Sequence, residues 1–321
     1  MGFTVLRSNI FSTHLPFRDH PVETLTRIRN SGVPGRIVFR LPTSHQLQFR
    51  GNVAGADGSG AVKRRRLTLA ASSLDLPLLP FNMNEVLVPT ESKTLHLYEA
   101  RYLALLEESL QRKNNLFVHF VLDPVSISQT ATEASFAARF GCLVVIESVE
   151  RLDVGALVCI RGVGRVKISR FSVSEADPYL SGEVNPMRDY LVLESDELNS
   201  KVAKLKESIR NLNSLEIKLK APKEAPLQTR IYNSLNWAET ETPLECDEAF
   251  FPSTAERVSF AALQPVSGST ESEVTRLREE KIRAMGMKDT VKRIELSMEL
   301  IKENISSVAA KLAIQSLGIK P

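Results

Sequence analysis

The chain has 321 residues, of which 43% are apolar and 25% are charged, a composition typical of globular proteins. No stretch approaches the roughly 20 consecutive apolar residues of a membrane-spanning helix, so no such span is predicted. The net charge of +3 conceals a split, because 11 of the 41 basic but only three of the 38 acidic residues precede residue 74. The remaining 30 basic and 35 acidic residues argue against a basic nucleic-acid-binding surface.

Residues 1–73 have the composition of a leader rather than of a folded domain. They are rich in Arg, Ser, Thr and Gly, and the Gly- and Ala-rich residues 51–61 offer little to build a core. An Arg-rich, acid-poor N-terminus without a secretory apolar region is typical of an organelle transit peptide. Its length favours the chloroplast stroma, with the mitochondrion as the alternative. A plain disordered tail, or a nuclear signal in the basic run at residues 63–66, remains an open interpretation.

Beyond residue 73 the pattern changes to short β-rich runs with turn residues between them. Gly162 and Gly164 are predicted to form a bend between two strands. Parallel crossovers need helices of about a dozen residues between strands, and those are missing, so we expect a small, mainly antiparallel, barrel-like sheet. One early helix is predicted over residues 99–113, and strands over residues 85–89, 94–98, 116–122, 140–149, 156–160, 165–171 and 179–184.

After about residue 191 the apolar spacing becomes helical. Residues 221–246 are interpreted as a loop or short helices, and capping-box patterns at residues 253–256 and 270–273 predict two further helix starts. The first helix of this region is marked by Val202, Leu205, Ile209 and Leu212.

The last helix has the clearest pattern, with steps of three and four residues, and closes with Gly318 as a C′ glycine. The same stripe fits packing inside an intramolecular helical bundle or a coiled coil between subunits. We favour the bundle because the stripe barely reaches the heptad number that a coiled coil needs, and homo-oligomerisation through this helix stays open. The stripe consists of Val291, Ile294, Met298, Ile301, Ile305, Val308 and Leu312.

Several segments, taken in order, carry a set of motifs. Residues 76–81 read LPLLPF and residues 97–106 read LYEARYLALL; residues 161–168 read RGVGRVKI and residues 178–184 read PYLSGEV. Together with residues 143–147 and 257–261, they resemble the N-terminal, substrate-binding domains of Lon proteases, and the standalone chloroplast type found in plants. The resemblance covers residues 76–190 well and residues 191–317 more loosely.

Three positions depart from the family pattern. Ala100 stands where the E-P-R-Y motif has proline, Gly182 stands where alanine is usual, and residues 90–92 replace a glycine-containing turn. These departures concern local turn geometry.

The resemblance implies an α+β fold, a PUA-like antiparallel β pseudo-barrel followed by an α-helical bundle. The order of strands first and helices afterwards predicts the same division from periodicity alone. We therefore expect a leader over residues 1–73, a barrel over residues 74–190, and a bundle with a long C-terminal helix over residues 191–321.

No catalytic, cofactor-binding or metal-binding residue is predicted. Gly162 and Gly164 lack the spacing of a P-loop, and the length leaves no room for the ATPase and Ser-Lys protease domains of complete Lon proteases. Three scattered cysteines and five histidines show no metal-ligand spacing. Cys159 and His119 could be imagined as a nucleophile and base, but both lie in apolar strands. His96 and His119 are interpreted as barrel histidines.

The remaining polar and aromatic candidates are given structural roles. Glu99 lies at a helix start, where a negative charge suits the helix dipole. Arg101 is expected to pair with Glu99 or a loop carbonyl, and Tyr102 to face the core. Trp237 is expected to pack against the bundle rather than on a ligand.

The resemblance to Lon substrate-binding domains implies a non-catalytic polypeptide-binding module, an adaptor or holdase in chloroplast protein quality control. Its expected partners are unfolded polypeptides or a protease or chaperone complex. Met285 and Met287 are candidates for an adaptable apolar contact, with core filling as the alternative. RNA binding is the alternative function, because PUA-like barrels also occur in RNA-associated proteins, but the acidic charge argues against it.

Overall fold

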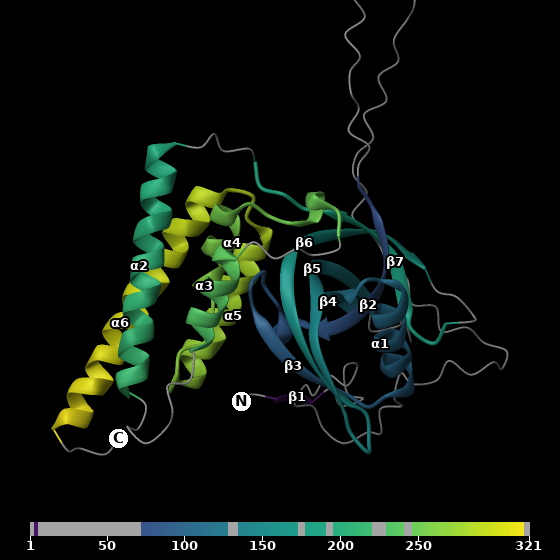
Figure 1. The fold of residues 1–321 in the computed structure, drawn as a ribbon, viewed down its shortest axis with the longest axis horizontal. Helices are drawn as coiled ribbons and strands as arrows, with labels where there is room; N and C mark the ends of the chain where they lie inside the picture. The colour runs from purple at the N-terminus through teal and green to yellow at the C-terminus, as the bar shows by residue number, and fades with distance from the viewer. Residues whose placement is uncertain are drawn as a thin grey trace, which may run out of the picture.

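The computed structural model describes residues 3–5, 72–127, 134–172, 177–190, 195–219, 229–240 and 246–317. Strands come first along the chain and helices follow, which confirms the α+β class, and the two parts lie side by side (Figure 1). The expected leader lies outside the described residues, apart from residues 3–5 and 72–73, and so does Gly318.

Seven strands form one sheet that closes on itself. Their order is β1-β3-β6-β5-β4-β2-β7, and β7 also pairs with β6, so that β2, β4, β5, β6 and β7 make a ring. β3 extends the sheet beside the first half of β6, while β7 pairs with the second half. This is the expected pseudo-barrel. The strands are β1 (Phe3–Val5), β2 (Leu74–Asn82), β3 (Ser92–Leu97), β4 (Leu116–Ile127), β5 (Ala134–Arg151), β6 (Ala156–Ser172) and β7 (Leu180–Pro186).

The sheet is mixed rather than purely antiparallel. Five strand pairings are antiparallel, whereas β2–β4 and β1–β3 are parallel. β2 and β4 are connected through β3 and α1 (Ala100–Arg112), and a connection of this length can return the chain in the same direction. The early helix, predicted correctly from its spacing, thus serves as the crossover that the sequence argument had discounted.

β6 is one continuous strand, so its glycines do not separate two strands as predicted, and the bend expected between them takes the form of a bulge. The register between β5 and β6 shifts here and leaves Val163 without a partner, which marks a β-bulge. A Cβ atom on Gly162 would lie 2.4 Å from the carbonyl oxygen of Val88, and one on Gly164 would lie 2.5 Å from that of Phe250. Glycine is therefore required by the close approach of other backbone segments.

The strand predicted for residues 85–89 is also wrong. A 3-10 turn, η2 (Met83–Glu85), is followed by irregular backbone in which Val86, Leu87 and Val88 are all buried. The apolar run predicted burial correctly, but these residues join no ladder, and the carbonyl of Val88 lies close against Gly162 at the bulge of β6.

The helices pack as a bundle against the barrel. The predicted capping box of α5 is present, with Thr270 and Glu273 each accepting from the other's backbone N–H. The apolar stripe of α6 packs against α2, so the intramolecular bundle describes it. The segment interpreted as a loop or short helices contains α3. The helices are α2 (Asp196–Leu219), α3 (Arg230–Glu239), α4 (Thr254–Ala261), α5 (Glu271–Gly286) and α6 (Thr290–Ser316), with a 3-10 turn, η3 (Glu248–Phe250), before α4.

The hydrophobic core runs through the junction between barrel and bundle. One cluster of buried residues joins Leu79 and Val144 of the barrel to Phe260, Leu277 and Leu300 of the helices. The two parts are therefore packed on each other rather than connected only by the chain.

Candidate functional site

β5 continues past the end of one of its neighbours. Its pairing with β4 stops at Val145, opposite Leu116, whereas its pairing with β6 continues to Arg151, opposite Ala156. Within the part of the chain that the structure describes, no strand covers the other side of residues 147–151. This segment therefore presents an open strand edge.

The turn that ends β5 shows which backbone groups face this edge. The N–H of Leu152 donates to the carbonyl of Gly155 at 3.1 Å, so these two residues occupy a hydrogen-bonded position of the hairpin. Such positions alternate along an antiparallel pair, so the N–H and C=O groups of Glu150 point towards β6. Those of Val149 and Arg151 point away from β6, and no described backbone group meets them.

A groove of about 390 Å³ lies against the open edge. Its volume falls within the range of roughly 300–1,000 Å³ that is usual for ligand sites. α1 supplies the opposite wall through Leu110, and Glu107 of the same helix forms an ion pair with Arg151. The two side chains of this pair are 44% and 52% exposed. The lining residues are Leu110, Asn115, Ile146, Glu147, Ser148, Val149 and Arg151.

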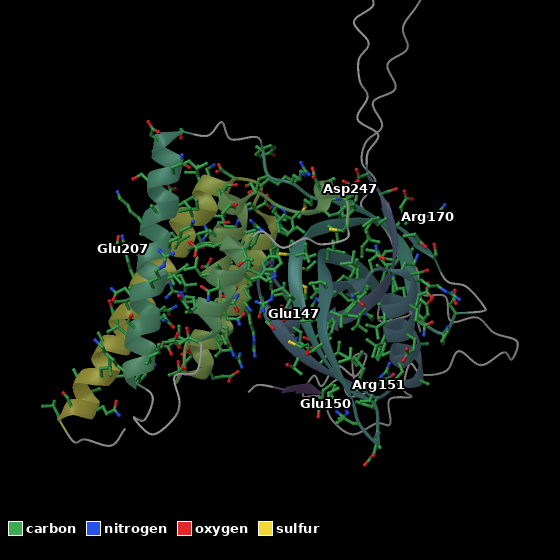
Figure 2. All side chains as sticks on the ribbon, in the orientation of Figure 1. Glu147, Glu150, Arg151, Arg170, Glu207 and Asp247 are labelled. Atoms are coloured by element: carbon green, nitrogen blue, oxygen red, sulfur yellow. The ribbon has the colours of Figure 1, made fainter. Side chains whose placement is uncertain are left out.

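Apolar and acidic side chains continue the site at the tip of the β5–β6 hairpin. Leu152 is 38% and Val154 69% exposed. Glu150 and Asp153 are also exposed, and neither forms an ion pair with a described residue. Figure 2 shows Glu150 and Arg151 near this tip and Glu147 farther along the sheet. The site thus combines free backbone groups, apolar contacts and uncompensated negative charge.

Glu147 anchors the groove to the rest of the molecule. It lies at a second bulge in the β5–β6 pairing, and the buried Arg161 donates to its carboxylate from Nε at 2.7 Å and from Nη2 at 3.2 Å. Nη1 of Arg161 donates to the Thr90 carbonyl at 3.1 Å and to Oδ1 of Asn233 at 2.6 Å. The strand that lines the groove is thereby tied to α3.

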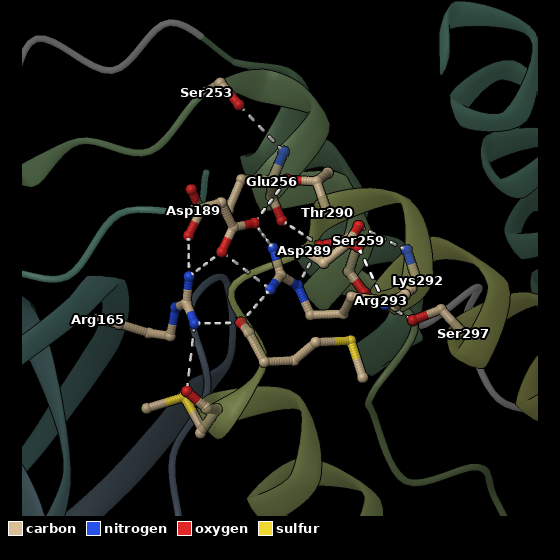
Figure 3. Close-up of polar contacts among 12 residues, drawn as sticks. Arg165, Asp189, Ser253, Glu256, Ser259, Asp289, Thr290, Lys292, Arg293 and Ser297 are labelled. Atoms are coloured by element: carbon tan, nitrogen blue, oxygen red, sulfur yellow. Dashed lines mark hydrogen bonds and ion pairs between the residues drawn. The ribbon is translucent and has the colours of Figure 1, made fainter. Parts of the chain in front are cut away.

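A buried ion network fixes the barrel on the bundle (Figure 3). Arg165 of β6 and Arg293 of α6 have fully buried side chains, and both contact Asp189, which follows β7. Arg165 also donates to Glu256 of α4 at 2.8 Å. Because two cations face two carboxylates inside the protein, the network compensates its own charges and acts as a structural joint.

The joint shifts the pKa values of its two carboxyl groups in opposite directions. Burial raises the pKa of Glu256 above its ordinary value, and the charge of Arg165 only partly offsets this effect. Burial acts on Asp189 in the same way. There, however, the hydrogen bond and charge of Arg293, with the charge of Arg165, outweigh it and hold the pKa of Asp189 below its ordinary value.

The two methionines singled out from the sequence lie beside this joint. Met285 is fully buried in the shared core, and Met287 is half-buried against the same cluster. Their carbonyls accept hydrogen bonds from Nη1 of Arg165 at 3.2 and 2.6 Å. Core filling, the alternative reading, describes Met285, and neither residue lines the groove.

His119 and Cys159 have separate, structural surroundings. His119 is buried and stacks on Phe81 with ring centroids 3.8 Å apart; burial, together with the charge of Lys93, lowers its pKa well below the ordinary value. Cys159 lies 3.5 Å from Ser92 and from Glu147, and burial raises the pKa of its thiol. No hydrogen bond joins the two described side chains.

The other residues singled out also make structural contacts. His96 is half-buried and its Nε2 lies 3.1 Å from the carbonyl oxygen of Val154. Arg101 donates to Glu99 at 2.9 Å, as one of the two expectations had it, and Tyr102 is buried. Trp237 of α3 lies against Phe251, with ring centroids 5.9 Å apart, and packs against a hydrophobic cluster of the barrel rather than that of the bundle as expected.

The described residues contain no group of three or more His, Cys, Asp or Glu that could hold a metal ion. None of their helices combines the length and apolar character needed to cross a membrane.

The family model of the ATP-dependent protease La (LON) substrate-binding domain matches residues 75–248, which include the barrel, the groove, α2 and α3. A Lon N-terminal domain protein from Xanthomonas campestris is similar at 17% identity over 69% of this chain and 95% of that one, with a TM-score of 0.38. The N-terminal domain of Mycobacterium avium complex Lon protease is similar at 14% identity over 71% and 98%, with a TM-score of 0.42. No curated protein sequence matches the chain.

Proposed function

This chain belongs to the family of ATP-dependent protease La (LON) substrate-binding domains, and on that premise we propose that it binds polypeptides without processing them itself. The family match over residues 75–248 carries the proposal, because it includes every residue of the groove beside β5. The groove supports it as well, since its mixture of apolar, polar and charged lining suits protein chains of varied sequence.

We further propose that the protein acts as an adaptor or holdase in protein quality control in the chloroplast. The support for the location is the Arg-rich, acid-poor composition of residues 1–73. A fusion of residues 1–73 to a fluorescent reporter should be imported by isolated chloroplasts and shortened there. Import by mitochondria alone, or by neither organelle, would count against this location.

Polypeptide binding can be tested with the full chain and a permanently unfolded protein, reduced and carboxymethylated α-lactalbumin. Fluorescence anisotropy of the labelled probe should show saturable binding, whereas native α-lactalbumin should not bind. Incubation with ATP should release neither peptides nor phosphate. Absence of binding, or ATP-dependent degradation by the chain alone, would overturn the proposal.

A matched pair of variants locates the binding surface. Leu152 and Ile217 are 38% and 40% exposed, but only Leu152 adjoins a residue that lines the groove, Arg151. Leu152→Ser should weaken binding of the unfolded probe several-fold, because it removes apolar contact area at the site. Ile217→Ser, on α2, should leave the affinity unchanged. Equal effects of the two variants would exclude the groove as the binding surface.

A further inference from the structure

We infer that the bound polypeptide is an extended segment that adds a strand to the open edge of β5, hydrogen-bonded to the backbone of Val149 and Arg151. This inference rests on the proposed function and specifies the conformation of the bound chain. It concerns a recognition mode in which the backbone supplies affinity and alternate side chains supply specificity.

The backbone groups at this edge fit an extended partner. Val149 and Arg151 are two residues apart, and their N–H and C=O groups face away from β6. A strand repeats its outward groups at the same interval of about 7 Å, so an added strand could form about four hydrogen bonds with these two residues. A helix uses its own N–H and C=O groups internally and cannot meet this pattern.

The groove provides the space for the side chains of such a strand. Successive side chains of a strand point to opposite sides, so every second one would enter the groove between Leu110 and Val149. The ion pair of Arg151 with Glu107 connects β5 to α1, the two elements that form the walls of the groove. Because exposed pairs of this kind contribute about 0–1 kcal/mol, it can open at little cost when a segment enters.

The charges around the edge favour basic residues in the bound segment. Glu150 and Asp153 are exposed without an ion-pair partner among the described residues, whereas the charges of Glu107 and Arg151 balance each other. Complementary charge of this kind mainly accelerates association and selects partners. The expected ligand is therefore an unfolded segment with alternating apolar side chains and flanking Lys or Arg. A proline at a position that bonds to Val149 or Arg151 would prevent binding.

The test uses the full chain and a fluorescein-labelled nine-residue peptide in which Val alternates with Thr between terminal lysines. We expect Val149→Pro to weaken binding at least about tenfold, because proline removes the N–H that faces the edge. The hydrogen bonds between β5 and β6 should persist in this variant, since proline is tolerated on an edge strand where the N–H side faces solvent. Val149→Thr keeps both the N–H and the β-branched shape, and should lose much less affinity than Val149→Pro does.

A second arm avoids any change to the protein. The same peptide methylated at every internal backbone nitrogen cannot donate to β5 and should bind at least about tenfold more weakly to the unmodified chain. This arm decides the matter if circular dichroism shows that Val149→Pro does not fold.

The outcomes separate this inference from the function on which it rests. Equal binding of the methylated and unmethylated peptides, or unchanged binding of carboxymethylated α-lactalbumin by folded Val149→Pro, overturns strand addition and leaves polypeptide binding in place. Failure of both the peptide and α-lactalbumin to bind the unmodified chain overturns both.

Discussion

Thr90 has a left-handed backbone with φ of +72°, which β-branched residues rarely adopt. Its N–H donates to the carbonyl of Gly162 at 2.8 Å, and its hydroxyl lies 2.7 Å from that of Ser234. Its carbonyl accepts from the Ser234 hydroxyl at 2.9 Å and from Arg161 at 3.1 Å. Strain at such a residue costs about 1–3 kcal/mol and is retained where several surrounding contacts together fix the backbone conformation. The hydrogen bonds of Thr90 provide such contacts.

We expect Ser234→Ala to lower the free energy of unfolding by about 1–3 kcal/mol, because it leaves the buried hydroxyl of Thr90 without this partner. Ser208→Ala is the matched control. Ser208 lies on an exposed face of α2 and bonds only to the carbonyl of Lys204, so its substitution should change stability by less than about 0.5 kcal/mol. Urea denaturation measures both. Equal effects of the two variants would show that Ser234 does not support the turn.

The sequence revealed the unusual turn but not what supports it. Residues 90–92 were visible as a departure from a glycine-containing pattern, and Thr90 indeed has the backbone conformation that glycine adopts most easily. Its partner Ser234 is 144 positions away, in a segment that the sequence described only as a loop or short helices. Gly182 is a similar case, because a Cβ atom there would lie 2.4 Å from the carbonyl oxygen of Arg170 on the neighbouring strand.

At the scale of elements, the start of α1 follows from local chemistry. Glu99 is the N-cap residue, with extended backbone angles of −76° and 135° and no side-chain capping bond. The first helical bonds run from Tyr102 and Leu103 to the Glu99 carbonyl, at 2.9 and 3.0 Å. Ala100 is therefore the first helical residue, and its own N–H is not needed for the helix. Proline suits this first helical position. The residue before a proline prefers an extended backbone, which Glu99 has.

Ala100→Pro should accordingly raise the free energy of unfolding by about 0.4–1 kcal/mol, because proline restricts the unfolded chain while fitting the folded one. Ala104→Pro, within the same helix, should lower it by about 3 kcal/mol or more, because it breaks an internal hydrogen bond. Thermal and urea denaturation check both values. A loss of stability in Ala100→Pro would mean that the N–H of Ala100 has a role in the fold.

Elements with strong periodicity were predicted well, and those that depend on distant contacts were not. Spacing alone located β3, β4, α1 and α6, since alternation and three-to-four steps follow directly from strand and helix geometry. The continuity of β6 and the parallel pairing of β2 with β4 depend on which backbones meet in space. The groove could not be predicted for the same reason, because it exists where β4 begins several residues short of the end of β5.

At the scale of the whole molecule, the barrel and the bundle share a core and an ion network. Arg165, Asp189, Glu256 and Arg293 come from four elements or connections and meet with little solvent contact. Removing one member of such a network leaves an uncompensated buried charge, which typically costs about 3–5 kcal/mol. The joint therefore holds the two parts in one arrangement and also makes stability depend on pH.

We expect Asp189→Asn to lower the free energy of unfolding at pH 7 by about 3–5 kcal/mol. The folded protein holds the pKa of Asp189 below its ordinary value of 3.8, so its contribution is present above that value and is lost as pH falls through the lowered pKa. The difference between the variant and the unmodified chain should thus shrink below about pH 3.8. Urea denaturation at a series of pH values measures this difference in the free energy of unfolding. Asp153→Asn, at an exposed position, is the control.

Glu256 has the opposite pH dependence. Its pKa is raised in the folded protein, so its contribution is fully present below its ordinary pKa and is lost as pH rises through the raised value. In the unmodified chain, the free energy of unfolding should therefore fall as pH rises above 4.5, the ordinary pKa of this side chain. Glu256→Gln should weaken or remove that fall.

A constant difference in the free energy of unfolding between Asp189→Asn and the unmodified chain from pH 7 to pH 2 would contradict the assignment of Asp189.

Binding of an extended polypeptide along β5 is tested most directly by hydrogen–deuterium exchange of the full chain with and without carboxymethylated α-lactalbumin. We predict slower exchange at the amides of Val149 and Arg151, whose N–H groups face the open edge, and unchanged exchange in α2 and α6. Saturating binding with no slowing at these two amides would contradict it.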